Sequence, residues 1–262
     1  LNFADRLNNF ILALFITSIV AVVYPMLSKL SHEDNKEKFS EYIVKSSNSI
    51  IILVIPISIG AIVLSKPIVK LLFERGAFDI SATQMTASAL SMYSIGLVAY
   101  GLRDIINKVF YSLQDTKTPM INGAIAMGLN IVLNIIFVKF MGHAGLALAT
   151  SLSALICTFL LFYSLRKKIG NFGQGKILIT AIKSLLSAIL MGICVTFAHK
   201  FIINYTGTGF IGQAISIFGS VLAGVIVYGI SVIILKIEEV SMIIDLLVKK
   251  INDKENQPST YA

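Results

Sequence analysis

The segment LNFADRLNNFILALFITSIVAVVYPML, residues 1–27, places a charged pair, Asp5 and Arg6, directly before a long apolar run. A helix needs about 20 mostly apolar residues to cross the hydrocarbon core of a bilayer. Helices are favoured there because they satisfy their own backbone hydrogen bonds in the absence of water. The segment therefore predicts a membrane span with a carboxylate and a guanidinium at one end.

The whole chain has the composition of an integral membrane protein. Its 262 residues are 56% hydrophobic and only 14% charged, and the mean hydropathy is +0.83. A soluble domain needs more polar surface than this composition supplies. Long continuous apolar runs favour helices over the short alternating strands of a membrane β-barrel. We predict an all-α polytopic bundle of about seven transmembrane helices, over residues 7–27, 43–64, 84–113, 119–138, 144–164, 178–199 and 212–235.

Two further segments are predicted to lie at the membrane surface. In KPIVKLLFERGAFD, residues 66–79, Lys66, Lys70 and Glu74 share one helical face, which predicts a short interfacial helix ended by Gly76. Apolar residues recur at helical spacing after residue 236, so residues 237–262 are expected to form an amphipathic surface helix followed by a disordered tail.

The basic residues predict the orientation. Most of the 22 Lys and Arg residues lie in or beside the loops at 28–42, 114–118 and 165–177 and the C-terminal segment. Cytoplasmic loops carry such an excess, so we expect a cytoplasmic C-terminus. The net charge of +8 then reflects topology and contact with anionic lipids, and no nucleic-acid partner is expected. Because the chain begins at Leu1 without a signal peptide, we expect an N-terminal part to precede it.

Ionisable residues within spans are candidates for function. Such a group costs at least about 2.5 kcal/mol at the bilayer centre and normally faces the bundle interior or a watery cavity. Arg6 either lines a cavity, reaches the lipid headgroups or pairs with Asp5. Arg103 and Asp104 point about 100° apart on a helix, so each is expected to have a partner on another span. Alternatively, the last turns of this long span project into the cytoplasm and Arg103 lies at the interface. These residues are candidate ligands for a charged substrate.

A set of polar residues on the fourth and fifth spans has a more specific geometry. Asn130 and Asn134 are neighbours at i, i+4, and the short KFMGHAG connection, residues 139–145, brings Thr150 to a similar depth on the next span. Their oxygens suit a monovalent cation. The alternative is that these residues only bond the two helices together.

The sequence lacks the patterns of enzymes. It has no Ser/His/Asp set, phosphate-binding loop or cysteine cluster, and its three histidines are scattered. We therefore expect a protein that is not an enzyme, with no metal or organic cofactor beyond the candidate monovalent cation.

Four motifs are similar to those of one family: FADRLNNF (3–10), PMLSKLS (25–31), FERGAF (73–78) and FYSLQDTKTP (110–119). They resemble the MurJ/MviN family of lipid II flippases, within the multidrug/oligosaccharidyl-lipid/polysaccharide exporter superfamily. The resemblance runs over about residues 1–240 and implies the C-terminal half of a transporter with fourteen spans. Residues 1–166 then correspond to the second lobe without its first helix, and residues 167–236 to the two final spans.

The resemblance also implies a function and sites. The family moves lipid II across the bacterial cytoplasmic membrane by alternating access. Its essential arginine falls on Arg6, beside Asp5, as a ligand for the headgroup diphosphate. A cation site of some members matches Asn130, Asn134 and Thr150, although an amide replaces the acidic residue expected near Asn134. The last two spans imply a groove for the polyprenyl tail, with Lys183 beside it.

The resemblance leaves other functions open. The chain could belong to a flippase for another polyprenyl-linked oligosaccharide, to a drug/cation antiporter, or to a non-transporting scaffold of cell-wall synthesis. The family's other cavity arginines lie in the first lobe, so the expected partners are lipid II, membrane lipids and that lobe. This chain alone is not expected to transport.

Overall fold

The computed structural model describes residues 1–33, 35–207 and 209–240, and these residues form helices and connections without any β-strand. Within them, seven helical runs are long and apolar enough to cross a membrane, which confirms the predicted all-α bundle. The runs extend past the predicted ends because a helix continues beyond the apolar core that hydropathy detects. They are Asn2–His32, Lys36–Val63, Ile80–Ser112, Lys117–Met141, His143–Ile169, Gln174–Thr206 and Phe210–Ile234.

Two of the runs are interrupted. The first consists of α1 (Asn2–Ile11), a π-helical turn η1 (Leu12–Ile16) and α2 (Thr17–His32). The third consists of α5 (Ile80–Ile95) and α6 (Leu97–Ser112), separated at Gly96. The other elements are α3 (Lys36–Val63), α4 (Ser65–Phe73), α7 (Lys117–Met141), α8 (His143–Ile169), α9 (Gln174–Thr206) and α10 (Phe210–Ile234).

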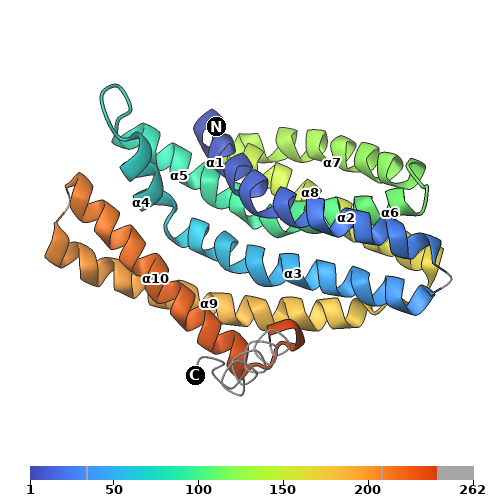
Figure 1. Cartoon of the computed structure of the whole chain (residues 1–262). Helices are drawn as coiled ribbons and strands as arrows, with labels where there is room; N and C mark the ends of the chain where they lie inside the picture. Colours follow the sequence, from blue (N-terminus) through green and yellow to red (C-terminus); the bar gives the residue numbers. More distant parts are fainter. Residues whose placement is uncertain (34, 208, 241–262) are drawn as a thin grey trace, which may run out of the picture.

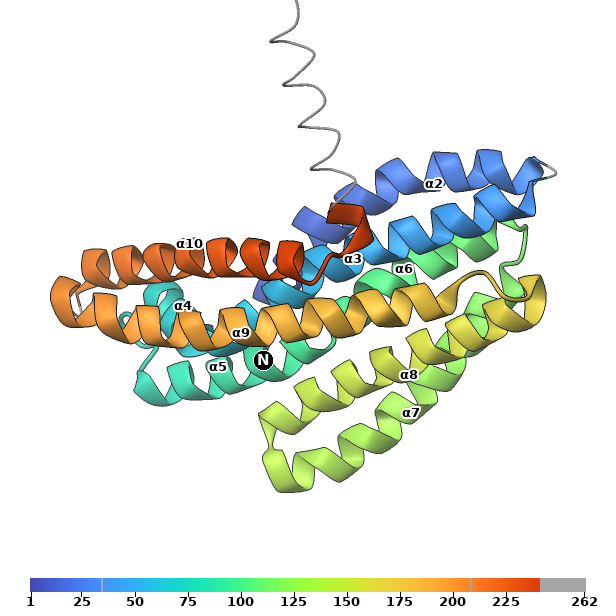
Figure 2. The same cartoon turned by 90° about the horizontal axis from the view of Figure 1, so that it is seen from below.

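The helices are arranged as two outer pairs around a central group. The α9–α10 pair lies along one side and the α7–α8 pair along the other, with α3, α5 and α6 between them (Figures 1 and 2). The interrupted first span packs across this centre, because α1 contacts α5 while α2 contacts α6 and α3. The centre of the bundle therefore lies where α6 meets α3 and α8.

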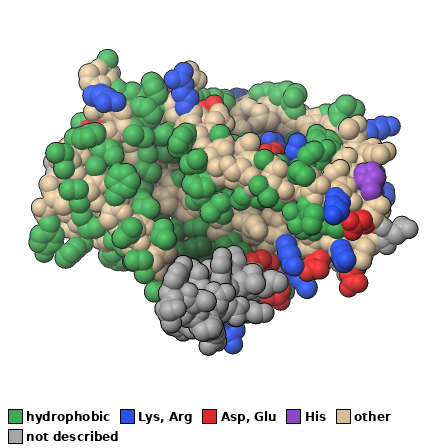
Figure 3. All heavy atoms as spheres, in the orientation of Figure 1, with side chains coloured by type: hydrophobic (Ala, Val, Ile, Leu, Met, Phe, Trp, Pro, Cys, Tyr) green, Lys and Arg blue, Asp and Glu red, His purple; other side chains and the backbone are tan. Residues whose placement is uncertain are grey.

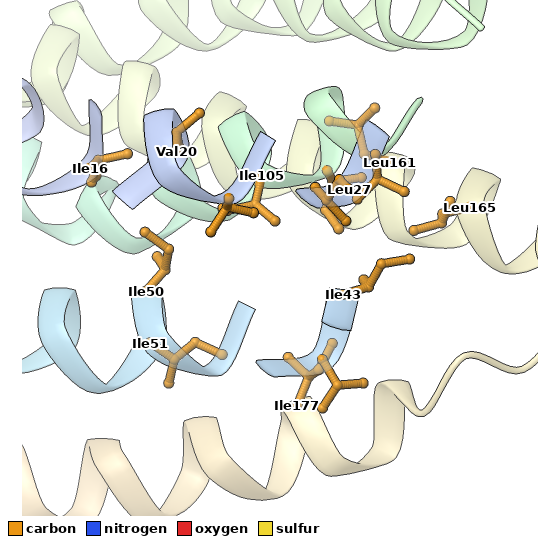
Figure 4. Close-up of a cluster of buried hydrophobic side chains, with 14 of the residues drawn as sticks. Ile16, Val20, Leu27, Ile43, Ile50, Ile51, Ile105, Leu161, Leu165 and Ile177 are labelled. Carbon is orange, nitrogen blue, oxygen red and sulfur yellow. The ribbon is translucent and has the colours of Figure 1, made fainter. Parts of the chain in front are cut away.

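The main apolar core joins most of the helices. Side chains of η1, α2, α3, α6, α8 and α9 converge there (Figure 4), and Ala126 adds a buried side chain from α7. A smaller cluster around Ala4, Val69 and Leu90 joins α1, α4 and α5. Lipid tails are as apolar as these side chains, so close packing rather than escape from water holds the cores together. The residues labelled in the figure are Ile16, Val20, Leu27, Ile43, Ile50, Ile51, Ile105, Leu161, Leu165 and Ile177.

The break in the third span is stabilised by α8. A Cβ atom at Gly96 would lie only 2.8 Å from the Oγ and 2.9 Å from the Cα of Ser151. The Ser151 hydroxyl lies against the end of α5, 2.6 Å from the carbonyl oxygen of Met92 and 3.2 Å from that of Tyr93. The hydroxyl therefore provides a hydrogen-bond donor for carbonyl groups near the break. Inside a membrane, no water is present to do so.

Two details of the sequence prediction are corrected by the structure. The first span was predicted to end at residue 27, just after Pro25, but Pro25 lies inside α2, which continues to His32. Apolar residues on both sides of Pro25, Val23 and Leu27, are buried in the core, so packing stabilises the helix across the missing backbone donor. The predicted short helix exists as α4, but it ends at Phe73, before Gly76.

The C-terminal prediction is only partly covered. The expected surface helix and tail occupy residues 237–262, and residues 241–262 lie outside the described part of the chain. At the other predicted boundary, near residue 167, α8 ends at Ile169 and α9 begins at Gln174.

The connection between α6 and α7 is held by Asp115, in the FYSLQDTKTP motif. Its carboxylate accepts hydrogen bonds from the backbone NH (3.0 Å) and hydroxyl (2.8 Å) of Thr118 at the start of α7. Lys168, in the last turn of α8, places its Nζ atom 2.5 Å from the same carboxylate. These interactions, led by the hydrogen bond from Lys168, lower the pKa of Asp115 to about 2.

We expect Gly96→Ala to destabilise the protein by about 1–3 kcal/mol, since the new methyl group would overlap the Cα and side-chain atoms of Ser151. The matched control is Gly60→Ala in α3, where nothing lies within 4 Å of the new Cβ. That change is expected to be neutral or stabilising, because Ala favours helix. Thermal unfolding in detergent measures both, and equal midpoints for the two variants would contradict the Gly96 contact.

We expect Asp115→Asn to lower stability by roughly 0.5–1 kcal/mol near neutral pH, since Asn can still cap α7 but cannot pair with Lys168. The folded-state pKa of Asp115 is below its usual value, so its contribution is complete above about pH 4. It is lost as the pH falls toward 2. The difference between the unfolding midpoints of wild type and variant should therefore shrink over that range. A difference that stays constant from pH 7 to pH 2 would exclude the ion pair.

Candidate functional site

A polar pocket of about 440 Å³ lies between α6, α7 and α8. Charged and amide side chains enter it from α6 and α7, and hydroxyl groups enter from α8. The polar side chains among its lining are Tyr100, Arg103, Asp104, Asn107, Asn130, Thr150 and Ser153. Because the rest of the spans is apolar, this polar pocket is a candidate binding site for a polar or charged ligand.

The start of α6 determines which residues face the pocket. Within α6, which begins after Gly96, Tyr100, Arg103 and Asn107 fall on one face because they are spaced three and four residues apart. Asp104 lies next to this face and also lines the pocket. The structure thus brings both candidates from the third span to one cavity, and their role in binding stays a prediction.

Arg103 contacts an aromatic ring instead of a carboxylate. Its guanidinium carbon lies over the ring of Tyr100, 5.0 Å from the centroid. The Tyr100 hydroxyl donates to the backbone carbonyl of Thr150 on α8 (3.5 Å). Within the described residues, the ion pairs involve Lys45, Lys70 and Lys168. The expected charged partners of Arg103 and Asp104 on other spans are therefore not found there.

The candidate cation ligands lie beside the same pocket. Asn130 and Thr150 line it, and the Nδ2 of Asn134 donates to the Oδ1 of Asn130 (2.9 Å). The Oδ1 of Asn134 is buried and has no hydrogen-bond partner. The Thr150 hydroxyl donates to the carbonyl of Leu146 on its own helix (2.9 Å), which leaves its oxygen free to accept. As expected, α7 and α8 lie side by side. In the described part of the chain, neither asparagine forms a hydrogen bond with Thr150.

Arg6 lies apart from this pocket. Ala4 and Asn8 of α1 are buried, whereas Asp5 and Arg6 are exposed. Residues two apart on a helix point in nearly opposite directions, so Arg6 faces away from the packed side of α1. Asp5 accepts a hydrogen bond from Asn9 (3.0 Å), and no ion pair joins it to Arg6 in the described chain. The pairing alternative for Arg6 is therefore not observed, and its binding role stays a prediction.

Lys183 also lies away from the pocket. It is half-buried on α9, and its Nζ donates to the backbone carbonyl of Lys236, just beyond α10 (3.1 Å). A cation there interacts favourably with the C-terminal end of a helix. Beside it, the hydroxyl of Tyr228 joins α10 to Ser184 of α9 (2.8 Å) and to the carbonyl of Ile52 on α3 (2.7 Å).

Charged side chains are unevenly distributed on the surface. They gather at the end of the bundle where the α2–α3 connection lies, whereas much of the opposite half of the visible face is apolar (Figure 3; compare Figure 1). Acidic and basic side chains are also visible in a hollow of this face (Figure 3). The exposed apolar residues of α9 and α10 include Phe197, Phe201, Phe218 and Leu222.

Sequence reasoning did not identify Tyr100, Asn107 or Ser151. Tyr100 and Asn107 lie three residues before and four residues after Arg103, which is a detectable helical spacing. The role of Ser151 depends on the break at Gly96. A glycine within an apolar run is a weak signal for such a break, because helices tolerate isolated glycines.

Comparison with known proteins agrees with this architecture. The family described as lipid II flippase MurJ matches residues 1–216, most of the chain. The chain belongs to the MurJ family.

Individual MurJ proteins match different lengths of the chain. A probable lipid II flippase MurJ of Vibrio cholerae is 40% identical over 165 residues, covering 63% of this chain and 31% of that protein. One from Bdellovibrio bacteriovorus is 30% identical over 240 residues, covering 92% of this chain and 45% of that protein. A solved structure, lipid II flippase MurJ in an inward closed conformation, is 28% identical with a TM-score of 0.67, and the match covers 89% of this chain and 46% of that one. The chain thus spans less than half the length of these relatives.

Proposed function

We propose that this chain forms part of a transporter that moves lipid II, a polyprenyl-diphosphate-linked muropeptide, across the bacterial cytoplasmic membrane. The observation that carries the proposal is the pocket between α6, α7 and α8, in which Arg103 lies within a membrane-spanning bundle of the MurJ family. No covalent bond needs to be made or broken. The chain supplies binding groups and moving helices rather than catalytic residues.

The proposed ligands of the diphosphate are Arg103, which lines the pocket beside Asp104, and Arg6, which lies outside the pocket beside Asp5. A guanidinium presents several NH donors in a plane and binds phosphate oxygens with two at once. Such charge-assisted bonds strengthen where little water is present. The exposed position of Arg6 is compatible with a surface that meets a first lobe, which is the proposed protein partner.

The polyprenyl tail is proposed to lie along α9 and α10. Both helices expose large apolar side chains, including Phe197 and Leu222, to the surroundings. A tail that stays in this apolar environment avoids the cost of crossing water, while the headgroup moves through the polar pocket. Lys183, at the opposite end of this face from the α9–α10 turn, is proposed to lie beside the tail.

The proposed orientation places the C-terminus in the cytoplasm. The charged end of the bundle contains the α2–α3, α6–α7 and α8–α9 connections, and Lys168 and Lys176 belong to this end. Positive residues are enriched in short cytoplasmic loops. The distribution of charge therefore supports this orientation.

A monovalent cation is proposed to bind beside the pocket through Asn130, Asn134 and Thr150. The unpartnered, buried Oδ1 of Asn134 supports the proposal, because an oxygen without a donor can serve a cation. When bound, the cation would supply positive charge, and these oxygens would orient α7 against α8.

Arg6→Ala is expected to abolish growth in cells that depend on the transporter containing this chain after depletion of their own flippase. It is also expected to weaken lipid II binding at least about tenfold, since a bidentate charged contact is lost. Complementation and native mass spectrometry with lipid II measure the two effects.

The control for this experiment is Arg75→Ala, which removes an exposed arginine of the α4–α5 connection. It should support growth and bind lipid II normally. Normal growth and binding of the Arg6→Ala protein would refute the role of Arg6.

Asn134→Asp is expected to tighten Na⁺ binding about tenfold or more, because a carboxylate adds a negative charge to neutral oxygen ligands. The dependence of the thermal unfolding midpoint on NaCl, against choline chloride, measures this. Asn122→Asp places the same change on α7 beside Ser164, away from the proposed ligands, and should add no Na⁺ dependence. Equal Na⁺ responses in the two variants would count against the site.

A further inference from the structure

Tyr100 is held at the pocket by α8. The break at Gly96 allows close contact with Ser151, and three residues later the carbonyl of Ala99 accepts a hydrogen bond from Thr158 (2.9 Å). The Tyr100 hydroxyl then reaches the carbonyl of Thr150 (3.5 Å). The first turn of α6 is therefore attached to α8 at two points, one at the backbone of Ala99 and one at the Tyr100 side chain.

The ring is the partner of the pocket arginine. Tyr100 and Arg103 lie three residues apart, so their side chains are neighbours on one face of α6. The guanidinium carbon is 5.0 Å from the ring centroid, within the range of a cation–π contact. Both residues are half-buried and both line the pocket.

An aromatic partner has different consequences from a carboxylate. A carboxylate would take up NH donors of the arginine and add a negative charge that repels phosphate. A ring attracts the cation through its quadrupole, carries no net charge, and leaves the NH groups available for oxyanions. This distinction matters here because Asp104 already brings one carboxyl group to the pocket.

We propose that Tyr100 is a positioning residue, which holds the Arg103 guanidinium in the pocket with its NH donors available to the diphosphate of a lipid-linked substrate. The proposal rests on the proposed function, because it needs Arg103 to contact that diphosphate. It adds a residue whose ring, rather than its hydroxyl, determines how strongly the substrate is bound.

The test measures lipid II binding to the transporter containing this chain by native mass spectrometry. Tyr100→Leu and Tyr100→Met remove the ring and keep an apolar side chain, and each is expected to weaken binding about 3- to 30-fold. Tyr100→Phe keeps the ring and should lose at most about threefold. Two ring-free variants are used so that a folding defect in one does not decide the result.

Coupling to Arg103 separates positioning from packing. In an Arg103→Gln background, Tyr100→Leu should change binding less than about twofold, because the group it positions is absent. Thermal unfolding midpoints of all variants monitor the fold. A loss from Tyr100→Leu that is equal in both backgrounds would overturn the proposal, as would a loss in Tyr100→Phe as large as in Tyr100→Leu.

The outcomes also distinguish this proposal from the proposed function. If Arg6→Ala and Arg103→Gln both leave lipid II binding unchanged, the diphosphate site itself is wrong. If Arg103→Gln weakens binding while Tyr100→Leu and Tyr100→Met do not, the site stands and only the role of Tyr100 is refuted.

Discussion

The contact between Gly96 and Ser151 determines the geometry on which the polar pocket depends. A membrane helix that breaks must find new partners for its freed carbonyl groups, since lipid offers none. The Ser151 hydroxyl lies within hydrogen-bonding distance of the carbonyl oxygens of both Met92 and Tyr93, and the missing side chain at Gly96 lets α8 approach closely enough for this. The third span therefore restarts as α6 at a defined point, and that point sets which residues of α6 face α7 and α8.

The pocket contains both acidic and basic side chains, and several of its polar groups have no hydrogen-bond or ion-pair partner in the described chain. Arg103 and Asp104 both line it, but Arg103 contacts the Tyr100 ring. Asn107 and Asn134 each carry a buried amide oxygen without a hydrogen-bond partner. Unpaired polar groups are costly in a dry interior, so a bundle that keeps them is expected to use them for a ligand or a movement. These unpaired groups are what supports the proposal that this part of a MurJ-family bundle binds a charged headgroup.

Much of the fold was predictable from local patterns. Apolar run length located all seven spans, and the spacing of Lys66, Lys70 and Glu74 located α4. The i, i+4 spacing predicted that Asn130 and Asn134 are neighbours on one helix face, and in the structure they are hydrogen-bonded to each other. The path of α2 past Pro25 was not predictable in this way, because it depends on burial of Val23 and Leu27 against other helices. The π-helical turn η1 was missed for the same reason, since its sequence is ordinary apolar helix.

By itself, the sequence determined that this protein is a bundle of membrane helices and which polar residues lie within its spans. Hydrophobicity and helical periodicity are properties of neighbouring residues, so they can be read without knowing the partners of a segment. Only the tertiary structure decided that Arg103, Asn130 and Thr150 share one pocket while Arg6 and Lys183 lie outside it. That division depends on how α6, α7 and α8 approach one another. The approach is set by contacts between residues distant in sequence, such as Gly96 with Ser151, and no local pattern encodes it.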